Sequence, residues 1–397
     1  EALSISTNNL TLTGDPGDTG ATVNDAGPGP NAPLLDGTGL GNTSAIILGA
    51  VTGLSIEGFE IANYENPAPG PGGTGGVGSG IESFNVATDN ITIADNHFHD
   101  LGWNGVLVAS NNGTIQNDWT VTRNLVEEVL YAGIELTNAT NSTVQYNDLS
   151  ARVNNNPGQQ TDPGDSGVGI EIATRDQAGI GVTSGGTLVD GNVISGSLFE
   201  RAGINLLSRA YVGSSDAVLE NVTVSNNTVS VSTGRGGIVV VAEERNGAVN
   251  ASFTNLLLDN NTIDANTTGL SIGIVGPPLD NATGIDGTYG ITGISNNDFT
   301  GNTDYHLRDI AEALSGAETY EIFSDTDVAA GFDGTGNTFD TATVVSNGAG
   351  VVQSTTSHNI RPGIQQSIDD ASSGDTVEVA DGTYNEALSI STNNLTL

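Results

Sequence analysis

Two glutamates are the residues of this sequence whose spacing best suits them to do chemistry. Glu135 and Glu171 each stand two positions after the glycine of a Gly-Ile pair, Gly133-Ile134 and Gly169-Ile170. If these pairs open neighbouring parallel strands, the two carboxylates lie about 5 Å apart. That separation matches the carboxylate pair of a retaining glycosidase, and mutual repulsion would raise the pKa of one member. The alternatives are a solvated acidic rib or a cation site.

Candidate metal ligands occur at two further places. His97 and His99 flank Phe98, so a strand would put both imidazoles on one face, although no third ligand is evident. The tetrapeptide DPGD occurs twice, and paired aspartates around a tight turn can bind calcium. An exposed histidine pair and plain turn formation explain the same residues. We therefore predict no cofactor, with calcium or another cation as the alternative at Asp15, Asp18, Asp162 and Asp165.

Short recurring blocks indicate the elements that must position these groups. One block, an apolar residue, two others, asparagine, one other and an apolar residue, occurs seven times, and Gly-apolar pairs recur between the blocks. Because asparagine tolerates left-handed geometry, we predict a sharp bend at each block, with the amides stacked in an internal ladder. The ladder residues are Asn96, Asn124, Asn147, Asn192, Asn227, Asn261 and Asn297. Aligning the Gly-apolar pairs gives an outward file of Glu82, Leu107, Glu135, Glu171, Asn205, Val239 and Ser271.

The most specific stretch runs from 359 to 397. It reads as a helix opened by Pro362 and closed by Gly374, a strand over 376–379, and the turn Asp381-Gly382-Thr383-Tyr384. With the asparagine-bearing blocks, this order resembles the first coil of the pectate-lyase-like, right-handed parallel β-helix superfamily. The resemblance implies an all-β, single-stranded right-handed parallel β-helix, or β-solenoid, with a short capping α-helix near 363–372. A second small helix is expected over 305–315.

The same resemblance bears on activity, because enzymes of this superfamily act on polysaccharides at an external groove. Their signature motifs are missing here: there is no epimerase-like YGFDPH, no polygalacturonase-like GHG and no lysine. Arginine can replace lysine as the base of a lyase, but nothing singles out Arg123, Arg175 or Arg235. The superfold also hosts adhesins and surface filaments, so fold alone does not decide function.

A duplicated segment defines the organisation of the chain. Residues 1–12, EALSISTNNLTL, recur as residues 386–397, which sets an internal period of 385 residues. We expect the chain to be one window on a tandem array, since long repeats usually indicate stacked architectures. Residues 1–357 would then hold the β-helix coils of one repeat. Residues 358–397 would hold the capping helix and first coil of the next.

The composition limits the partners. The chain has 47 acidic and 9 basic residues, and its net charge is −38. This field disfavours nucleic acid and anionic membranes, and it suits a high-salt organism, where the Debye length falls to roughly 3 Å. No apolar run is long enough to span a bilayer, so no membrane insertion is expected in this segment. Cysteine is absent, so no disulfide framework exists.

Glycosylation sequons are frequent, and they are expected on exposed positions of a cell-surface glycoprotein. These observations favour an extracellular structural protein over an enzyme, with tandem copies joined head to tail into a rod or filament. The alternatives are a polysaccharide-active lyase, hydrolase or epimerase, and an adhesin that binds surface glycans. The sequon asparagines are Asn9, Asn42, Asn90, Asn112, Asn138, Asn141, Asn221, Asn226, Asn250, Asn260, Asn266, Asn281 and Asn394.

Overall fold

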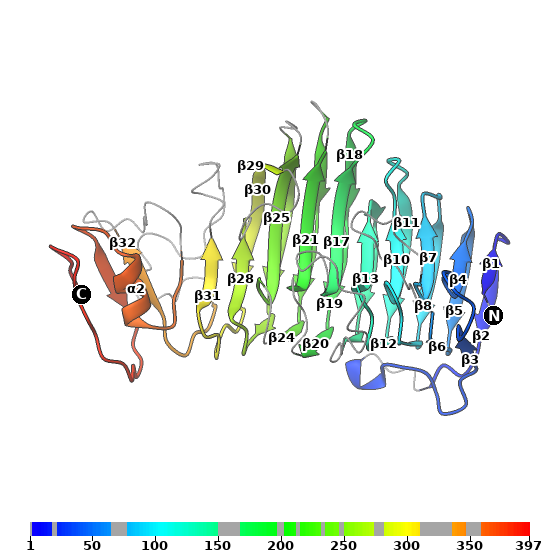
Figure 1. The fold of residues 1–397 in the computed structure, drawn as a ribbon, viewed down its shortest axis with the longest axis horizontal. Helices are drawn as coiled ribbons and strands as arrows, with labels where there is room; N and C mark the ends of the chain where they lie inside the picture. The colour runs from blue at the N-terminus through cyan, green and yellow to red at the C-terminus, as the bar shows by residue number, and fades with distance from the viewer. Residues whose placement is uncertain are drawn as a thin grey trace.

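Successive coils of the chain stack into a rod whose two termini lie at opposite ends (Figure 1). The structure is a computed structural model, and it describes residues 2–17, 22–64, 78–149, 167–196, 202–211, 215–231, 235–245, 250–273, 282–309, 336–346 and 359–397. Three parallel sheets, named A, B and C here, are visited in turn by each coil. The prediction of an all-β parallel solenoid with one short helix is confirmed.

Sheet A forms the face seen in Figure 1, and each of its strands pairs in parallel with the next coil. Its strands, in spatial order, are β1 (Leu3–Ile5), β4 (Ile46–Leu48), β7 (Ile81–Phe84), β10 (Val106–Ala109), β13 (Ala132–Thr137), β17 (Val168–Asp176), β21 (Ala202–Ala210), β25 (Ile238–Arg245), β28 (Thr268–Ile272) and β31 (Tyr305–Asp309). A further strand, β29 (Ala282–Asp286), pairs antiparallel with β25.

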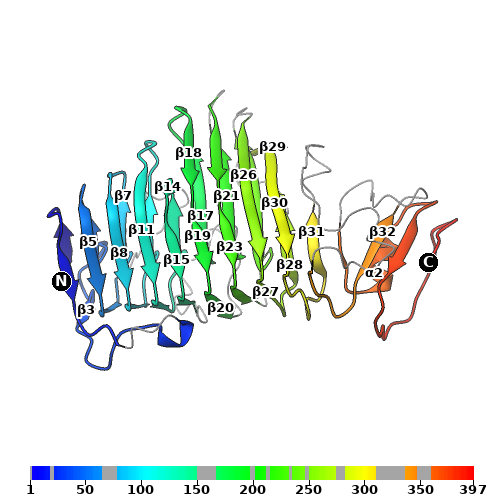
Figure 2. The same ribbon diagram turned by 180° about the vertical axis from the view of Figure 1, so that it is seen from behind.

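Sheet B lies on the opposite side and is best seen in Figure 2. Its main path contains β2 (Thr11–Thr13), β5 (Thr52–Glu57), β8 (Asp89–Ala94), β11 (Gln116–Thr122), β15 (Thr143–Gln145), β19 (Leu188–Asp190), β23 (Thr223–Ser225) and β26 (Ala251–Asp259). The additional strands β14 (Ala139–Thr140), β18 (Val182–Gly185), β22 (Ala217–Glu220) and β30 (Thr288–Ser295) extend it.

Sheet C closes each coil with a short strand. It contains β3 (Leu34–Asp36), β6 (Glu60–Ala62), β9 (His97–His99), β12 (Leu125–Val126), β16 (Asp148–Leu149), β20 (Val193–Gly196), β24 (Thr228–Val231) and β27 (Thr262–Ile263). The 3-10 turn η1 (Val23–Asp25) precedes β3 in the segment between sheets B and C of the first coil.

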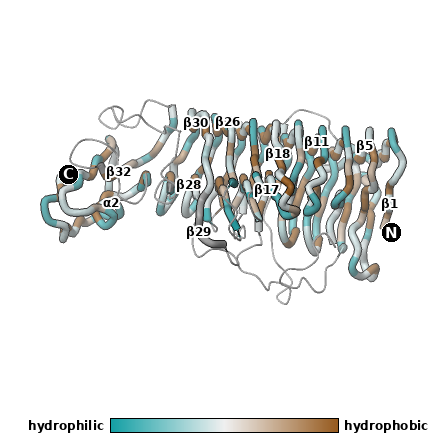
Figure 3. The backbone as a smooth tube through the Cα atoms, turned by 90° about the horizontal axis from the view of Figure 1, so that it is seen from above, coloured by the Kyte–Doolittle hydropathy of each residue, from teal (hydrophilic) through white to brown (hydrophobic). Residues whose placement is uncertain are grey.

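The core fills the space between the sheets with in-register aliphatic stacks, and apolar and polar residues alternate along the coils (Figure 3). Period-two alternation sends every second side chain of a strand inward, and parallel pairing puts those side chains on top of one another. In sheet A the buried stack consists of Ile46, Ile81, Val106, Ile134, Ile170, Ile204, Ile238, Leu270 and Leu307.

The cap lies beyond the last coil. It consists of α2 (Ile364–Asp370) and the antiparallel pair β32 (Thr343–Ser346) and β33 (Thr376–Val379). The helix predicted near 363–372 and the strand predicted over 376–379 are therefore confirmed. The helix predicted over 305–315 is wrong for residues 305–309, which form β31. Pairing with β28 overrides the apolar spacing that suggested a helix, and the rest of that prediction lies outside the described residues.

Within the part of the chain that the structure describes, no helix is long and apolar enough to cross a membrane.

Candidate functional site

The seven predicted asparagines line the corner between sheets B and C. Each side-chain amide donates to the carbonyl oxygen of the next asparagine at 2.9–3.1 Å, and the stack continues to an eighth member, Asn337. Asn192 shows the full pattern: its Nδ2 also donates to Val144 O, and its Oδ1 accepts from the backbone N–H of Asn147. Asn337 escaped the sequence pattern because Gly334 stands where the pattern requires an apolar residue. All eight are buried.

The bend at this corner has a different cause from the one expected. The left-handed residue is the one before each ladder asparagine, and the ladder residue itself is not left-handed. Several types fill this position, including Arg123 at φ 53° and Tyr146 at φ 57°. A left-handed residue turns the chain, and the following amide then points into the rod. The full set is Asp95, Arg123, Tyr146, Gly191, Asn226, Asn260, Asn296 and Gly336.

Two sequon asparagines are buried, which corrects the expectation that all sequons are exposed. Asn266 is 1% exposed and donates to Asn302 Oδ1 at 3.1 Å in a second, short ladder. Asn138 is fully buried and donates to Ser110 O and Arg175 O. A glycan on either nitrogen would break these bonds. Asn281 lies outside the described residues, and the exposed sequon asparagines are Asn9, Asn42, Asn90, Asn112, Asn141, Asn221, Asn226, Asn250, Asn260 and Asn394.

Glu135 and Glu171 are register partners on β13 and β17, on the outer face of sheet A. The whole file from Glu82 to Ser271 pairs in the order that the Gly-apolar alignment gave. The two glutamates are nevertheless buried, at 2% and 0% exposure, so they are not a solvated acidic rib. The Arg175 guanidinium bridges them, with Nη1 at 3.3 Å from Glu135 Oε1 and Nη2 in contact with Glu171 Oε1.

Both carboxylates of this pair accept further hydrogen bonds. Glu135 accepts from Asn104 Nδ2 at 2.9 Å and from the Thr137 hydroxyl at 2.9 Å, and Glu171 accepts from Asn205 Nδ2 at 2.8 Å. Burial raises the pKa of Glu135; Arg175 opposes this shift, and the charge of Glu171 adds to it. The expected direction therefore holds, but desolvation contributes more than repulsion.

Further ion pairs extend this charged surface along sheet A. Glu243 on β25 binds both Arg209 and Arg245, and Arg209 also donates to the Tyr211 hydroxyl at 3.2 Å. Burial raises the pKa of Glu243, but the two guanidiniums outweigh it and hold that pKa below its usual range. Together with Glu135, Glu171 and Arg175, these residues form what we call the charged file. Guanidiniums bind its carboxylates, so the arrangement fixes the positions of these buried charges.

The two histidines lie on β9 on either side of the inward-pointing Phe98, and their rings stand 4.5 Å apart. Each binds carboxylates: His97 Nε2 lies 2.8 Å from Glu127, and His99 contacts Glu60 at 3.1 Å and Asp100 at 2.8 Å. Burial lowers the pKa of His99, but the hydrogen bonds to Asp100 and Glu60 raise it overall.

No metal-binding group of three or more His, Cys, Asp or Glu side chains occurs among the described residues. Of the four aspartates proposed as cation ligands, Asp15 accepts from the backbone N–H of Asn31 at 3.0 Å and from its Nδ2 at 3.3 Å. The other three, Asp18, Asp162 and Asp165, lie outside the described residues.

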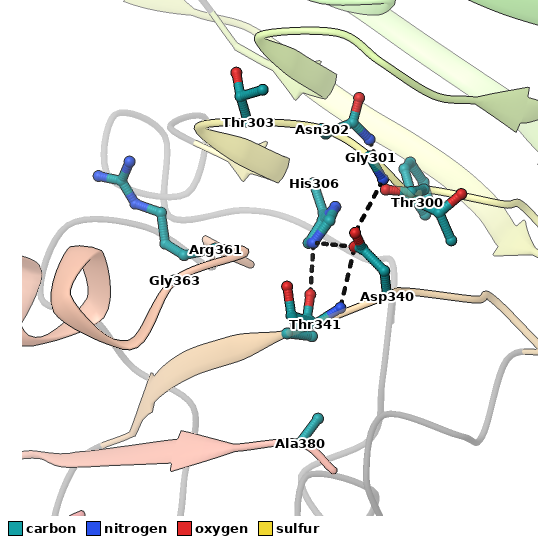
Figure 4. A network of polar contacts seen from close by, with 12 residues as sticks. Thr300, Gly301, Asn302, Thr303, His306, Asp340, Thr341, Arg361, Gly363 and Ala380 are labelled. Atoms are coloured by element: carbon teal, nitrogen blue, oxygen red, sulfur yellow. Dashed lines mark hydrogen bonds and ion pairs between the residues drawn. The ribbon is translucent and has the colours of Figure 1, made fainter. Parts of the chain in front are cut away.

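Polar contacts join the cap to the last coil, and Figure 4 shows those of Asp340, which accepts from Gly301 N–H at 3.3 Å and lies 3.6 Å from His306 Nε2. Arg361 donates to Asp304 Oδ1 at 2.7 Å and to Asp370 Oδ2 at 2.8 Å, and its guanidinium lies 3.5 Å from the centre of the Tyr305 ring. Beside it, the buried His306 contacts Thr341 O through Nε2 at 2.6 Å. Burial lowers the pKa of His306. Ion pairing and ring stacking therefore fix the cap to β31.

The duplicated segment occupies two different environments. In the first copy, Leu3–Ile5 forms β1 against β4, and residues 11 and 12 belong to β2 against β5. In the second copy, residues 386–397 lie on the cap, with Thr396 bridged in parallel to Thr376 of β33. The bend within the segment is the same in both copies, because Asn9 and Asn394 are left-handed with φ of 54° and 57°.

Neither protein-family models nor curated protein sequences match this chain.

Proposed function

We propose that this protein is a section of an extracellular structural rod, in which successive copies of the repeat are wound into one continuous β-solenoid. The observation that carries the proposal is the placement of EALSISTNNLTL. The same twelve residues open the coiled rod at one end and lie against the cap at the other. A cap that holds the opening segment of a repeat links one repeat to the next, because solenoid coils contact mainly their neighbours.

The interior of the rod supports a mechanical role. Aliphatic stacks and the asparagine ladder run through successive coils without interruption, so each coil is fixed by its neighbours on both sides. Such a core resists bending and local opening because its hydrogen bonds and packing contacts are repeated in each coil.

The acidic surface supports an extracellular location in a high-salt environment. A net charge of −38 with few basic residues repels itself unless salt screens it. We expect the Tm to fall when the protein is diluted from molar salt to low ionic strength, as measured by circular dichroism. A Tm that is unchanged across that range would contradict a high-salt design. The exposed sequon asparagines would carry glycans on the outside of the rod.

The polysaccharide-active alternative has weaker support. A retaining glycosidase needs one carboxylate free to attack and one free to donate a proton. Glu135 and Glu171 both contact Arg175 and are both buried. Turnover of neutral or acidic polysaccharides that is lost in Glu135→Gln would favour the enzyme over the rod. The adhesin alternative predicts saturable glycan binding without turnover, and a Tm lowered by chelation if calcium takes part.

A covalent two-copy chain tests the rod directly. In it, the second repeat continues from residue 397 with the residue equivalent to Thr13. We expect the longest dimension in small-angle X-ray scattering to double approximately, because one solenoid runs through the junction. Two flexibly linked particles would contradict the proposal. Sequencing the full gene provides an independent check, since a single copy between unrelated flanks would rule out the covalent array.

A further inference from the structure

The first copy of the duplicated segment bonds to the rod through one of its edges. Leu3 N–H donates to Ala45 O at 2.7 Å, and Ile5 O accepts from Gly49 N–H at 2.7 Å. In the second half of the segment, Leu10 O accepts from Ser55 N–H at 2.9 Å. Consecutive residues of a strand point their N–H and C=O groups to opposite edges. The backbone groups of Ser4 and Thr11 therefore point away from β4 and β5.

The second copy bonds to the cap through the opposite edge. Ser389, the equivalent of Ser4, donates its N–H to Gln365 Oε1 at 2.7 Å and accepts from Gln365 Nε2 at 3.2 Å. Thr396, the equivalent of Thr11, donates to Asp375 O at 3.0 Å and accepts from Val377 N–H at 2.8 Å. The backbone groups that the first copy points away from the coils are the ones that the cap binds.

Side chains show this division in part. Glu386 accepts from the backbone N–H groups of Ile364 and Gln365 at 2.7 and 2.9 Å, which ties the start of the second copy to the cap. In the second copy Leu388 and Ile390 face solvent, at 42% and 51% exposure, whereas Leu395 packs against Ile368 and Val377 of the cap. In the first copy, the equivalent of Ile390 is Ile5, which is only 7% exposed. One backbone edge of the segment thus suits the cap and the other suits the coils, while Leu395 packs on the cap and its equivalent Leu10 packs on the coils.

We infer that residues 1–12 of one molecule can replace residues 386–397 on the cap of another, so that copies of this chain also join head to tail without a covalent link. The partner is a second copy of this chain, and the contact surface consists of α2, β33 and residues 2–12. Sequence identity allows the incoming segment to make the same backbone contacts with the cap while it keeps its bonds to β4 and β5. The inference rests on the proposed function, because it specifies the junction between repeats.

The tethered second copy limits this exchange. Residues 386–397 belong to the same chain as the cap, and a short tether gives an effective concentration on the order of millimolar. A free molecule at a lower concentration therefore competes poorly. A substitution that weakens the binding of residues 386–397 to the cap should free the cap to bind a neighbouring molecule. A substitution confined to residues 1–12 should leave the cap occupied.

The identical copies provide a matched pair of full-length variants. Glu386→Ala with Thr396→Pro removes the carboxylate and the N–H that bind the cap. We expect this variant to show a concentration-dependent rise in mass in analytical ultracentrifugation, with rods in negative-stain micrographs, while the parent chain stays monomeric. Adding Thr11→Pro should return it to a monomer. Proline at Thr11 removes an N–H on the edge away from β5, so the pairing of β2 with β5 is kept.

If the variant with the released cap does not associate, a peptide-binding measurement still tests the inference. A fluorescent EALSISTNNLTL peptide should bind the Glu386→Ala/Thr396→Pro variant on the order of a hundredfold more tightly than the parent chain, and should reverse its association. A peptide carrying proline in place of the residue equivalent to Thr11 should not bind. Peptide binding that is equally weak in parent and variant overturns the inference, as does association that survives Thr11→Pro. Either result leaves the covalent two-copy rod untouched, so the two proposals fail separately.

Discussion

The corner between sheets B and C and the outer face of sheet A both stack buried polar side chains in register from coil to coil. At the corner, every ladder position is asparagine, and each amide is a donor and an acceptor for its neighbours. In the charged file, glutamates and arginines occupy neighbouring register positions without a fixed order, with Glu135 next to Glu171 and Arg175 next to Arg209. Among the described residues, Arg175 Nε and Asn205 Oδ1 are buried atoms without a hydrogen-bond partner, and no ladder amide is.

The difference shows how a repeating fold can bury polar groups safely. A neutral amide carries its donor and acceptor in one side chain, so identical residues satisfy one another indefinitely along the rod. Charges need an opposite partner at each level, and their desolvation is costly even when they are paired. We therefore expect the ladder to stabilise the fold uniformly, and the charged file to be sensitive to pH and to single substitutions.

The largest effect is expected from Arg175→Met. This change leaves Glu135 and Glu171 buried together without their shared guanidinium. Removing one partner of a buried ion pair costs about 3–5 kcal/mol, so the free energy of unfolding at pH 7 should fall by that order. Chemical denaturation measures it. Arg308→Met is the control, because Arg308 is half-exposed over the Tyr305 ring and should cost much less. Equal losses in the two variants would contradict a special role for the buried pair.

Asn192→Ala should have the next largest effect. It removes a ladder amide in the middle of the stack and leaves Val144 O and the side chain and backbone N–H groups of Asn147 without their partner. Unsatisfied buried groups of this kind cost about 1–3 kcal/mol each, and the losses are not additive. Urea denaturation should therefore show a lower free energy of unfolding for this variant, by an amount that does not depend on pH. Asn111→Ala, at an exposed position, should change little; if it matched Asn192→Ala, the ladder would not be the cause.

Glu135→Gln should show that the stability contributed by the charged file depends on pH, unlike the stability contributed by the ladder. The pKa of Glu135 is raised in the folded state, so the folded protein holds this proton more tightly than the unfolded chain does. The resulting stability is present below the unfolded pKa, near 4.5, and is lost as pH rises through the folded pKa. The substituted glutamine amide stays neutral, so the variant should gain on the parent as pH rises from about 4.5 to neutral.

Denaturation midpoints at several pH values measure this change, and Asp118→Asn, at an exposed position, serves as the control. Asn192→Ala should show no comparable slope. A parent and a Glu135→Gln variant whose stabilities stay parallel over the whole range would show that Arg175 fully compensates the charge.

Features that repeat in each coil could be predicted from the sequence, and features that depend on single distant contacts could not. The ladder and the register of Glu82 through Ser271 repeat in each coil, so spacing alone identified them, and the cap helix was marked by Pro362 and Gly374. The burial of Glu135 depends on contacts between positions distant in sequence, including Arg175 and Asn104, and no local pattern encodes it. Asn266 and Asn302 were missed because the second ladder is too short to repeat. Residues 305–309 were misassigned because pairing with β28 outweighs a helical pattern.

The smallest effect is expected at the turn before the second ladder. Ala265 is exposed and left-handed, with φ 55°, and it precedes the buried Asn266. A left-handed conformation costs an L-residue other than glycine or asparagine roughly 1 kcal/mol. Ala265→Gly should therefore stabilise the protein by about 0.5–1 kcal/mol, despite the greater freedom of glycine in the unfolded chain. Ala87→Gly, at an exposed position where φ is not positive, should destabilise it slightly. If both variants lost stability, the left-handed residue would be a passive part of the bend between β27 and β28, and the side-chain amide of Asn266 would alone hold that bend.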